Sequence, residues 1–223
     1  MASGDLHRYF LNNFNKPVSK WVHYFDVYER HFERFRGKPI TMLEIGVFDG
    51  GSLAMWKWYF GDQAKIVGLD INPECKAHEA EGIEVFIGSQ DDPEVIEKIF
   101  EKYPDIDIVL DDGSHVMKHL IASFEMLYYR IAEDGVYMVE DAHTCYWRRY
   151  GGGLGRPGTF IEYSKGLIDA MNAVHTRGRL AISDFTRATD SMAFYDSMIV
   201  FEKRPQGLRQ VVTTSLLPPE QRT

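Results

Sequence analysis

The 223-residue sequence has little cysteine, few cationic relative to anionic side chains, and no long apolar run. Its only cysteines, Cys75 and Cys145, lie far apart in the chain, so we expect no disulfide framework and a reducing, cytoplasmic location. No segment approaches the ~18 consecutive apolar residues of a membrane span, and the first ten residues lack a secretory pattern. The sequence therefore predicts a cytoplasmic protein without a membrane partner.

Positive charge is also scarce, because 25 Lys and Arg stand against 33 Asp and Glu, giving a net charge of −8. Nucleic-acid binding usually needs a basic patch that neutralises phosphates, so we expect no nucleic-acid partner. A small-molecule partner agrees better with this charge balance. The 44% hydrophobic content is enough to build the core of one larger α/β domain.

Short apolar runs and amphipathic stretches alternate through the middle of the chain. The predicted strands are 40–46, 65–70, 83–88, 106–110 and 135–140, and the predicted helices are 51–60, 93–103 and 116–131. Such alternation is typical of β-α-β units and a parallel sheet. Residues 192–204 predict two further strands with a tight turn near Asp196, so the mostly parallel sheet would end in an antiparallel hairpin.

The flanking regions give weaker signals. Aromatic residues at helical spacing predict an amphipathic N-terminal helix over 19–35. We expect 1–18 to form an N-terminal segment, 19–203 the domain, and 204–223 a loosely held tail. Five glycines and one proline within 151–158 predict a mobile surface loop.

A glycine-rich turn joins the first predicted strand to its helix in LEIGVFDGGS, residues 43–52. In an open parallel sheet, ligands bind outside the carboxyl ends of the strands, where glycine lets the backbone come close. Asp70 ends the next strand, where a carboxylate can accept hydrogen bonds from ribose hydroxyls. Phe48 replaces the middle glycine of the nicotinamide dinucleotide fingerprint, which argues against that cofactor. A tight turn without a ligand stays an alternative.

A third polar segment, GSQDD at 88–92, follows the third predicted strand. Ser89 and Gln90 are placed to contact an adenine edge. Asp91 and Asp92 are explained equally well as helix caps.

Two acidic pairs end neighbouring strands, in DDGSH (111–115) and EDAHT (140–144). Consecutive strands are usually adjacent, so we expect both pairs at one edge of the sheet, where their charges would repel each other. Neither motif contains Lys or Arg. Carboxylate oxygens are the ligands that Mg²⁺ prefers, and we therefore predict a metal site drawn from Asp112, Glu140 and Asp141. Zinc is disfavoured because no Cys/His ligand spacing occurs, and helix capping is the alternative for any single acid.

His115 lies three residues after Asp112. Histidine has an ordinary pKa of about 6.5, which suits removal of a proton near neutral pH, so His115 is a candidate general base. His143 is a weaker candidate for a supporting or substrate-contacting role.

The motifs LEIGVFDGGS, GLDI, DDGSH and EDAHTCYW, in this order, resemble those of metal-dependent class I S-adenosylmethionine (SAM) O-methyltransferases that act on sugars in natural-product biosynthesis. The mycinamicin and rhamnosyl O-methyltransferases are of this type, and related sequences often carry the label cephalosporin hydroxylase. The likeness covers residues 19–203, and DDGSH combined with the later Glu-Asp pair is its specific part. It implies a single Rossmann-like domain that uses SAM and Mg²⁺.

The resemblance also implies roles for individual residues. The methionine part of SAM would contact Glu44, Gly46, Gly50, Gly51 and Ser52. Asp70 would hold the ribose, with Ile71 also at the cofactor, while Ser89, Gln90 and Asp91 would line the adenine and Asp111 would lie near the cofactor. The metal ligands would be Asp112, Glu140 and Asp141, and the catalytic residues His115 and Asp112.

The acceptor is the least determined part of this interpretation. A sugar or glycoside hydroxyl is favoured, and a catechol or phenol is the alternative because it too offers oxygens to a metal. A redox-iron hydroxylase is a fainter possibility, and a non-catalytic SAM- or metal-binding module of a larger biosynthetic complex is a further alternative. The aromatic N-terminal helix could pack on its own domain or on a second subunit, so a homo-oligomer is also possible.

Overall fold

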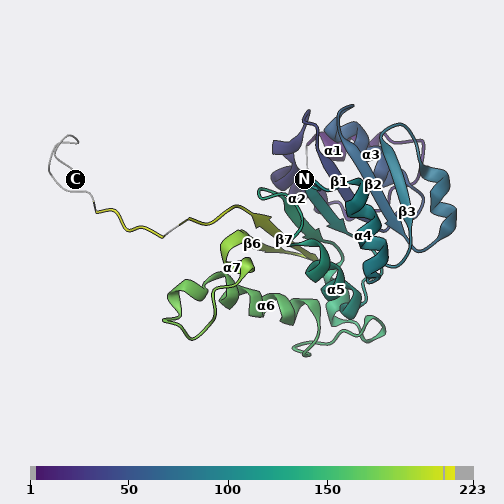
Figure 1. The fold of residues 1–223 in the computed structure, drawn as a ribbon. Coiled ribbons are helices and arrows are strands. Elements are labelled where there is room, and N and C mark those ends of the chain that lie inside the picture. The colour runs from purple at the N-terminus through teal and green to yellow at the C-terminus, as the bar shows by residue number, and fades with distance from the viewer. Residues whose placement is uncertain (1–3, 208, 214–223) are drawn as a thin grey trace, which may run out of the picture.

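The computed structural model describes residues 4–207 and 209–213, and seven strands within them form one sheet (Figure 1). The strand order is β3-β2-β1-β4-β5-β7-β6, and every pairing is parallel except the two that β7 makes. The predicted mostly parallel sheet with a closing hairpin is therefore confirmed. The strands are β1 (Thr41–Ile45), β2 (Lys65–Asp70), β3 (Ile83–Ile87), β4 (Ile108–Asp111), β5 (Val136–Val139), β6 (Thr189–Tyr195) and β7 (Met198–Lys203).

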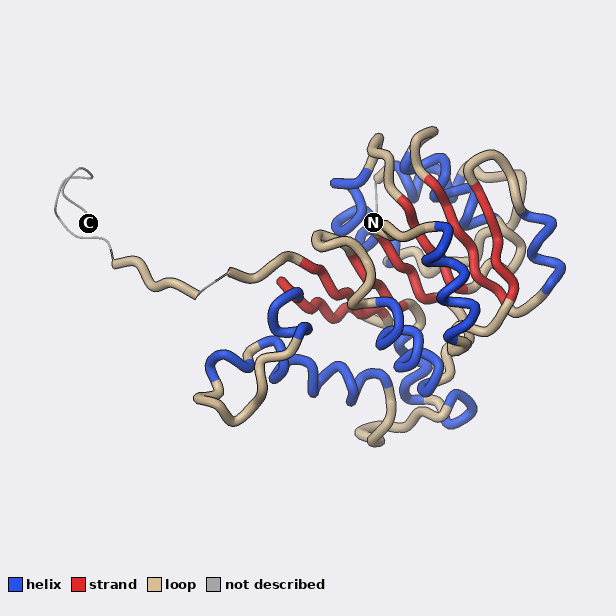
Figure 2. Tube along the Cα trace, viewed as in Figure 1, coloured by secondary structure: helices blue, strands red, loops and turns tan. Residues whose placement is uncertain are grey.

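Helices cover both faces of the sheet, which runs between them in Figure 2. Strand residues alternate between the two apolar layers, so Ile108 and Leu110 belong to the first layer and Val109 to the second. The first layer is completed by α1 (Asp5–Leu11), α2 (Tyr24–Phe32) and α3 (Gly51–Phe60), and the second by α4 (Pro93–Lys102), α5 (Met117–Leu127), α6 (Phe160–Met171) and α7 (Asp184–Ala188). The same alternation decides on which side of the sheet each acid at a strand end lies.

The predicted helix over 19–35 is too long at its N-terminal end. Helix α2 begins at Tyr24 and continues as a 3-10 turn, Glu33–Phe35, while residues 17–21 follow a non-helical path. The aromatic pattern misled the prediction because Trp21 fits the helical spacing but is 57% exposed and is not part of the buried face. We call residues 13–23 the strap.

The N-terminal segment contains a helix that the sequence analysis did not anticipate. Leu6 of α1 is buried in the same apolar layer as α2 and α3, and its backbone N–H donates to Glu29 Oε1 at 2.8 Å. The predicted cap of α4 is confirmed, since Asp92 accepts from the Glu94 N–H at 2.9 Å.

Beyond β5 the chain carries α6 and α7, which the sequence analysis also left unassigned. The loop 151–158 lies mostly at the surface, with Gly152 as its one buried residue. Part of the predicted tail is attached to the domain, because Arg204 N donates to Ala188 O and Gln206 N to Arg187 O, both at 2.8 Å. Residues 208 and 214–223 of the tail lie outside the described residues. None of the described helices combines the length and apolar character that crossing a membrane requires.

Candidate active site

Three cavities in the described part of the chain follow one another along the carboxyl ends of the parallel strands. A central cavity of 470 Å³ lies between one of 190 Å³ and another of 510 Å³. The central cavity shares Gly46, Asp70 and Gly113 with the small cavity of 190 Å³, and we call these the first two cavities. It shares Ser19, Lys20 and Asp112 with the cavity of 510 Å³, which we call the third. The strand order reverses between β1 and β4, which is where open parallel sheets bind their ligands. The three spaces together form one continuous candidate site.

Most of the predicted cofactor residues line the first two cavities. Asp70 is held at their junction, because its carboxylate accepts from the backbone N–H groups of Val47 and Asn72, both at 2.8 Å. Gly46 has φ +93°, and a Cβ there would come within 2.2 Å of the Asp112 carbonyl oxygen, so only glycine fits. The predicted residues that line these cavities are Gly46, Gly51, Ser52, Asp70, Ile71, Ser89 and Gln90.

Four predicted cofactor residues, Glu44, Gly50, Asp91 and Asp111, do not line these cavities. Glu44 is fully buried and accepts from Ser52 Oγ at 2.8 Å and from Trp56 Nε1 at 3.1 Å. Burial raises its pKa, and the nearby Lys20 ammonium opposes that shift. Glu44 therefore braces α3 from inside the protein.

Gly50 and Asp91 have local structural roles. Gly50 has φ +69° at the N-cap of α3, and its N–H donates to Val47 O at 2.9 Å. Asp91 accepts from Ser89 Oγ at 2.5 Å and lies 3.3 Å from His119 Nε2.

Asp111 is buried and is hydrogen-bonded by three neutral side chains. We call Asp111, Gln90, Ser123 and Tyr137 the inner network. Its carboxylate accepts from Ser123 Oγ at 2.6 Å, from Tyr137 OH at 3.1 Å, and from Gln90 Nε2 at 3.0 Å. Burial raises the pKa of Asp111, while the hydrogen bonds from Ser123 and Tyr137 oppose the shift. Because Gln90 also lines the small cavity, the network fixes one wall of that cavity from behind.

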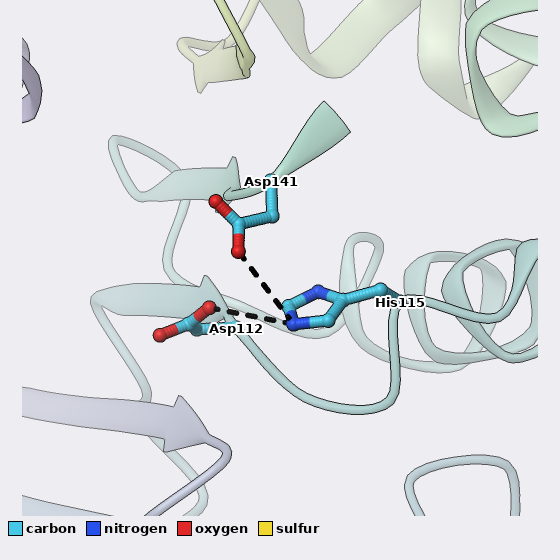
Figure 3. Close-up of side chains that lie close together, drawn as sticks. All are labelled: Asp112, His115 and Asp141. Atoms are coloured by element: carbon cyan, nitrogen blue, oxygen red, sulfur yellow. Dashed lines mark ion pairs between the residues drawn. The ribbon is translucent and has the colours of Figure 1, made fainter. Parts of the chain in front are cut away.

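Asp112, His115 and Asp141 converge on the other side, and we call them the outer cluster (Figure 3). His115 Nε2 lies 3.9 Å from Asp112 Oδ1 and 3.8 Å from Asp141 Oδ2. One potential ligand atom from each residue lies within 4.8 Å of the others. Asp112 and His115 also line the central cavity, while Asp112 and Asp141 line the third. The cluster thus lies where the central cavity meets the third cavity.

Two members of the outer cluster have an uncommon backbone conformation. His115 has φ +55° and Asp141 has φ +52°, in the left-handed region that non-glycine residues seldom adopt. Moreover, His115 Nδ1 is a buried side-chain atom without a hydrogen-bond partner, the one such atom found in the described residues. Strain and an unsatisfied polar atom at one place favour a functional site over a purely structural one.

Glu140, the third predicted metal ligand, is held apart from the outer cluster. It is buried, and its carboxylate accepts from Tyr28 OH at 2.5 Å and from Lys20 Nζ at 2.8 Å. Burial and the charge of Asp112 raise the pKa of Glu140 to about 8, against the opposing effect of Lys20. Asp112 and Asp141 together nevertheless suit Mg²⁺, which is commonly bound by one or two carboxylates and several waters.

A series of aromatic side chains begins at Trp21, which lines the third cavity. The ring of His143 lies 6.1 Å from that of Trp21 and 4.6 Å from that of Trp147, and Tyr150 continues the series 6.1 Å beyond Trp147. Trp21 and Trp147 are about half exposed. His143, the weaker sequence candidate, is thereby part of an aromatic rim made of Trp21, His143, Trp147 and Tyr150.

Sequence reasoning missed Lys20 and underestimated the tyrosines of α2. Tyr24 OH donates to Asp141 Oδ1 at 2.7 Å and contacts Ser197 Oγ at 2.8 Å, while Tyr28 binds Glu140. One signal pointed to a missing cation: four acids at one sheet edge with no basic residue in either motif need a positive group from elsewhere in the chain.

The strand order, the glycine turn after β1 and the acid at the end of β2 define a Rossmann-like class I methyltransferase domain. The chain belongs to the Rhamnosyl O-methyltransferase/CmcI family, whose model matches residues 14–145.

Its relatives agree with this assignment. Demethylmacrocin O-methyltransferase of Streptomyces fradiae is 37% identical over 162 residues, covering 68% of this chain and 40% of that protein. Mycinamicin VI 2''-O-methyltransferase of Micromonospora griseorubida is 37% identical over 175 residues, covering 74% and 42%. The methyltransferase MycE of the mycinamycin biosynthetic pathway, solved with Mg and SAH, superposes with a TM-score of 0.81 at 32% identity, covering 92% of this chain and 55% of that chain. The chain thus spans about half the length of these relatives.

Proposed function

We propose that this chain transfers the methyl group of SAM to a hydroxyl of a sugar or glycosylated small molecule, in a Mg²⁺-dependent reaction. The observation that carries the proposal is the sharing of lining residues between the cavity beside the glycine turn and the cavities on either side. A methyl donor in the first two spaces would meet an acceptor in the third at the outer cluster. The relatives' names, which include a rhamnosyl tetracenomycin-C 2'-O-methyltransferase, favour a glycoside acceptor.

For SAM, the chain offers a long site with distinct ends. Ser89, Gln90 and Ile71 would surround the adenine side, Asp70 would accept from the ribose hydroxyls, and Ser52 at the start of α3 would face the methionine side. When bound, SAM supplies an activated methyl group on a sulfonium. Glu44 acts indirectly here, because its hydrogen bonds to Ser52 and Trp56 hold the start of α3 in place.

For Mg²⁺, Asp112 and Asp141 are the proposed ligands, because their carboxylates face a common point. Glu140 lines the same third cavity but is paired with Lys20. When bound, a divalent cation orients acceptor oxygens and lowers the pKa of a hydroxyl. The chain's own contribution is to hold the carboxylates: Tyr24 donates to Asp141, and Tyr28 donates to Glu140. Such supporting hydrogen bonds orient metal ligands.

His115 is proposed as the general base. Its Nε2 faces Asp112 and Asp141, so this atom would take the acceptor proton while the neighbouring carboxylates stabilise the resulting imidazolium. Its Nδ1 is buried and has no hydrogen-bond partner among the described residues, so Nε2 is the nitrogen assigned this role.

The aromatic rim would stack on the face of the acceptor. Sugar rings and catechols both stack on aromatic side chains, so a catechol or phenol acceptor is the alternative within the same chemistry. A non-catalytic SAM-binding module is the alternative outside it. A homo-oligomer and a cytoplasmic location remain predictions, for which light scattering and cell fractionation are the tests.

Calorimetric titration with SAM, in Mg²⁺ and again in EDTA, tests the proposal directly. The same samples are then given a rhamnoside, a second deoxysugar glycoside and a catechol, and S-adenosylhomocysteine is measured. SAM binding in both buffers, with glycoside turnover in Mg²⁺ alone, is the expected result. Turnover that EDTA leaves unchanged would remove the metal from the proposal. Binding without turnover of any acceptor would favour the binding module, and absence of SAM binding would reject the cofactor site.

A further inference from the structure

The strap brings a distant lysine into the acids of the site. It runs between α1 and α2 and contributes Ser19 and Lys20 to both the central and the third cavity. Its path is tightly packed, because a Cβ on Gly51 would lie 2.0 Å from the carbonyl oxygen of Pro17. Asn13 Nδ2 donates to Lys16 O at 2.7 Å and braces the same segment. The position of Lys20 is therefore set by the strap.

The Lys20 side chain is buried, with 4% exposed, and its ammonium lies among three carboxylates. Its Nζ lies 2.6 Å from Asp112 Oδ2, 2.8 Å from Glu140 Oε2 and 3.8 Å from Glu44 Oε1. Burial disfavours the ammonium, but the charges of these three acids outweigh it and raise the pKa of Lys20 well above the ordinary lysine value. These distances make Lys20 the direct ion-pair partner of all three acids.

Two of the three acids that Lys20 holds are also predicted metal ligands. Asp112 gives one oxygen to Lys20 and turns the other toward His115 of the outer cluster. Glu140 has one oxygen on Lys20 and the other on Tyr28. An ammonium and a divalent cation beside the same carboxylates repel each other and compete for the same ligand atoms.

We propose that Lys20 is a positioning residue that competes with the divalent cation, holding Asp112 and Glu140 in place without metal and weakening the binding of Mg²⁺. This inference rests on the proposed function, because it takes these acids as the metal's binding place. It explains why a buried acid set can persist without a metal, since removing the cationic partner of buried charges is strongly destabilising.

Metal binding to purified Lys20→Gln, measured without SAM or acceptor, tests the inference. The control is Lys16→Gln on the same strap. Lys16 Nζ lies 3.3 Å from His78 Nδ1 and is not paired with these acids. Calorimetry with Mg²⁺ should give an affinity at least about tenfold above wild type for Lys20→Gln, because a nearby positive charge has gone. Lys16→Gln should match wild type. Melting curves should show a larger Mg²⁺-induced rise in Tm for Lys20→Gln than for either other protein.

An equal or weaker Mg²⁺ affinity of folded Lys20→Gln would overturn the inference. If Lys20→Gln is unfolded without metal, recovery of the folded state in Mg²⁺ supports the competition, whereas failure to fold in saturating Mg²⁺ rejects it. If wild type binds no Mg²⁺, the metal part of the proposed function fails separately. Gain of binding in Lys20→Gln would then still support Lys20 as the competitor, and no gain would reject it.

Discussion

Asp111 and Asp112 are consecutive at the end of β4, yet their side chains enter two different environments. Asp111 turns into the inner network, where each partner is a neutral donor: Gln90, Ser123 and Tyr137. Asp112 turns to the opposite side, toward the Lys20 ammonium and the outer cluster. The alternation of side chains at the end of a strand is enough to separate the two carboxyls.

The two carboxyls differ in whether groups of the protein satisfy them completely or leave them accessible to a ligand. In the inner network, hydrogen bonds satisfy the Asp111 carboxyl, which is buried away from solvent. Its contribution is therefore to the stability of the fold. In the outer cluster Asp112 and Asp141 lie near each other and near the His115 imidazole, and the Lys20 ammonium pairs with Asp112. Both carboxylates also line the third cavity, where a cation or an acceptor could reach them. Adjacent acids in a sequence motif can thus serve stability and chemistry separately.

Asp112→Asn should have the largest functional effect. The change removes one carboxylate of the outer cluster, and we expect Mg²⁺-dependent turnover to fall by about 100-fold or more. SAM affinity should change far less than turnover, because Asp112 borders the central cavity but the residues that line the small cavity are unaffected. Initial rates with saturating SAM and calorimetric SAM titration measure the two quantities. Turnover at the wild-type level in this variant would contradict the metal assignment of Asp112.

Asp111→Asn, the matched change one residue earlier, should act on stability instead. The new amide N–H₂ would face donors from Gln90, Ser123 and Tyr137, leaving at least one buried group unsatisfied. We expect the free energy of unfolding to fall by about 1–3 kcal/mol. Urea denaturation measures this loss, and turnover per folded molecule at saturating SAM should remain near wild type. A loss of Mg²⁺ affinity as large as that of Asp112→Asn would show that the two regions are not independent.

The sheet and the acids at its edge were predictable because they depend on local pattern. Strand and helix alternation placed Asp70, Asp112 and Glu140 at strand ends, and parallel pairing brings those ends to one edge. The sequence analysis placed Asp112 and not Asp111 in the metal site, but strand alternation alone does not fix which of the two turns inward, because that depends on where the strand stops. It also could not reveal that Glu44 is enclosed behind the cavity.

Lys20 was beyond such reasoning because its partners lie 92 and 120 residues away in sequence. The aromatic spacing around it favoured a helix, whereas tertiary contacts of the strap with the glycine turn and the acids prevail over that local preference. Helices α6 and α7 were missed too, although Thr159 caps α6 by accepting from the Glu162 N–H at 3.3 Å. The glycine-rich segment 151–158 just before Thr159 is typical of a loop, and a single capping threonine is a weak signal beside it.

Two tyrosine hydroxyls allow the smallest and sharpest test of the difference between the regions. Tyr137 donates to Asp111 in the inner network, and Tyr24 donates to Asp141 in the outer cluster. Tyr137→Phe should lower the free energy of unfolding by about 1 kcal/mol, because it removes a buried hydrogen bond, and should leave Mg²⁺ binding unchanged. Tyr24→Phe should weaken Mg²⁺ binding by about tenfold at most, because Asp141 loses an orienting partner.

Urea denaturation and Mg²⁺ calorimetry on both phenylalanine variants complete this test. Asp141 and Ser197, the partners that Tyr24→Phe releases, lie beside the third cavity or near the surface, so water can replace the lost hydroxyl and stability should change little. Asp111 has no such access, because it is fully buried. Equal effects of the two variants on metal affinity would mean that the sheet transmits changes from one side to the other. Opposite profiles would mean that one strand end separates a structural acid from a functional one.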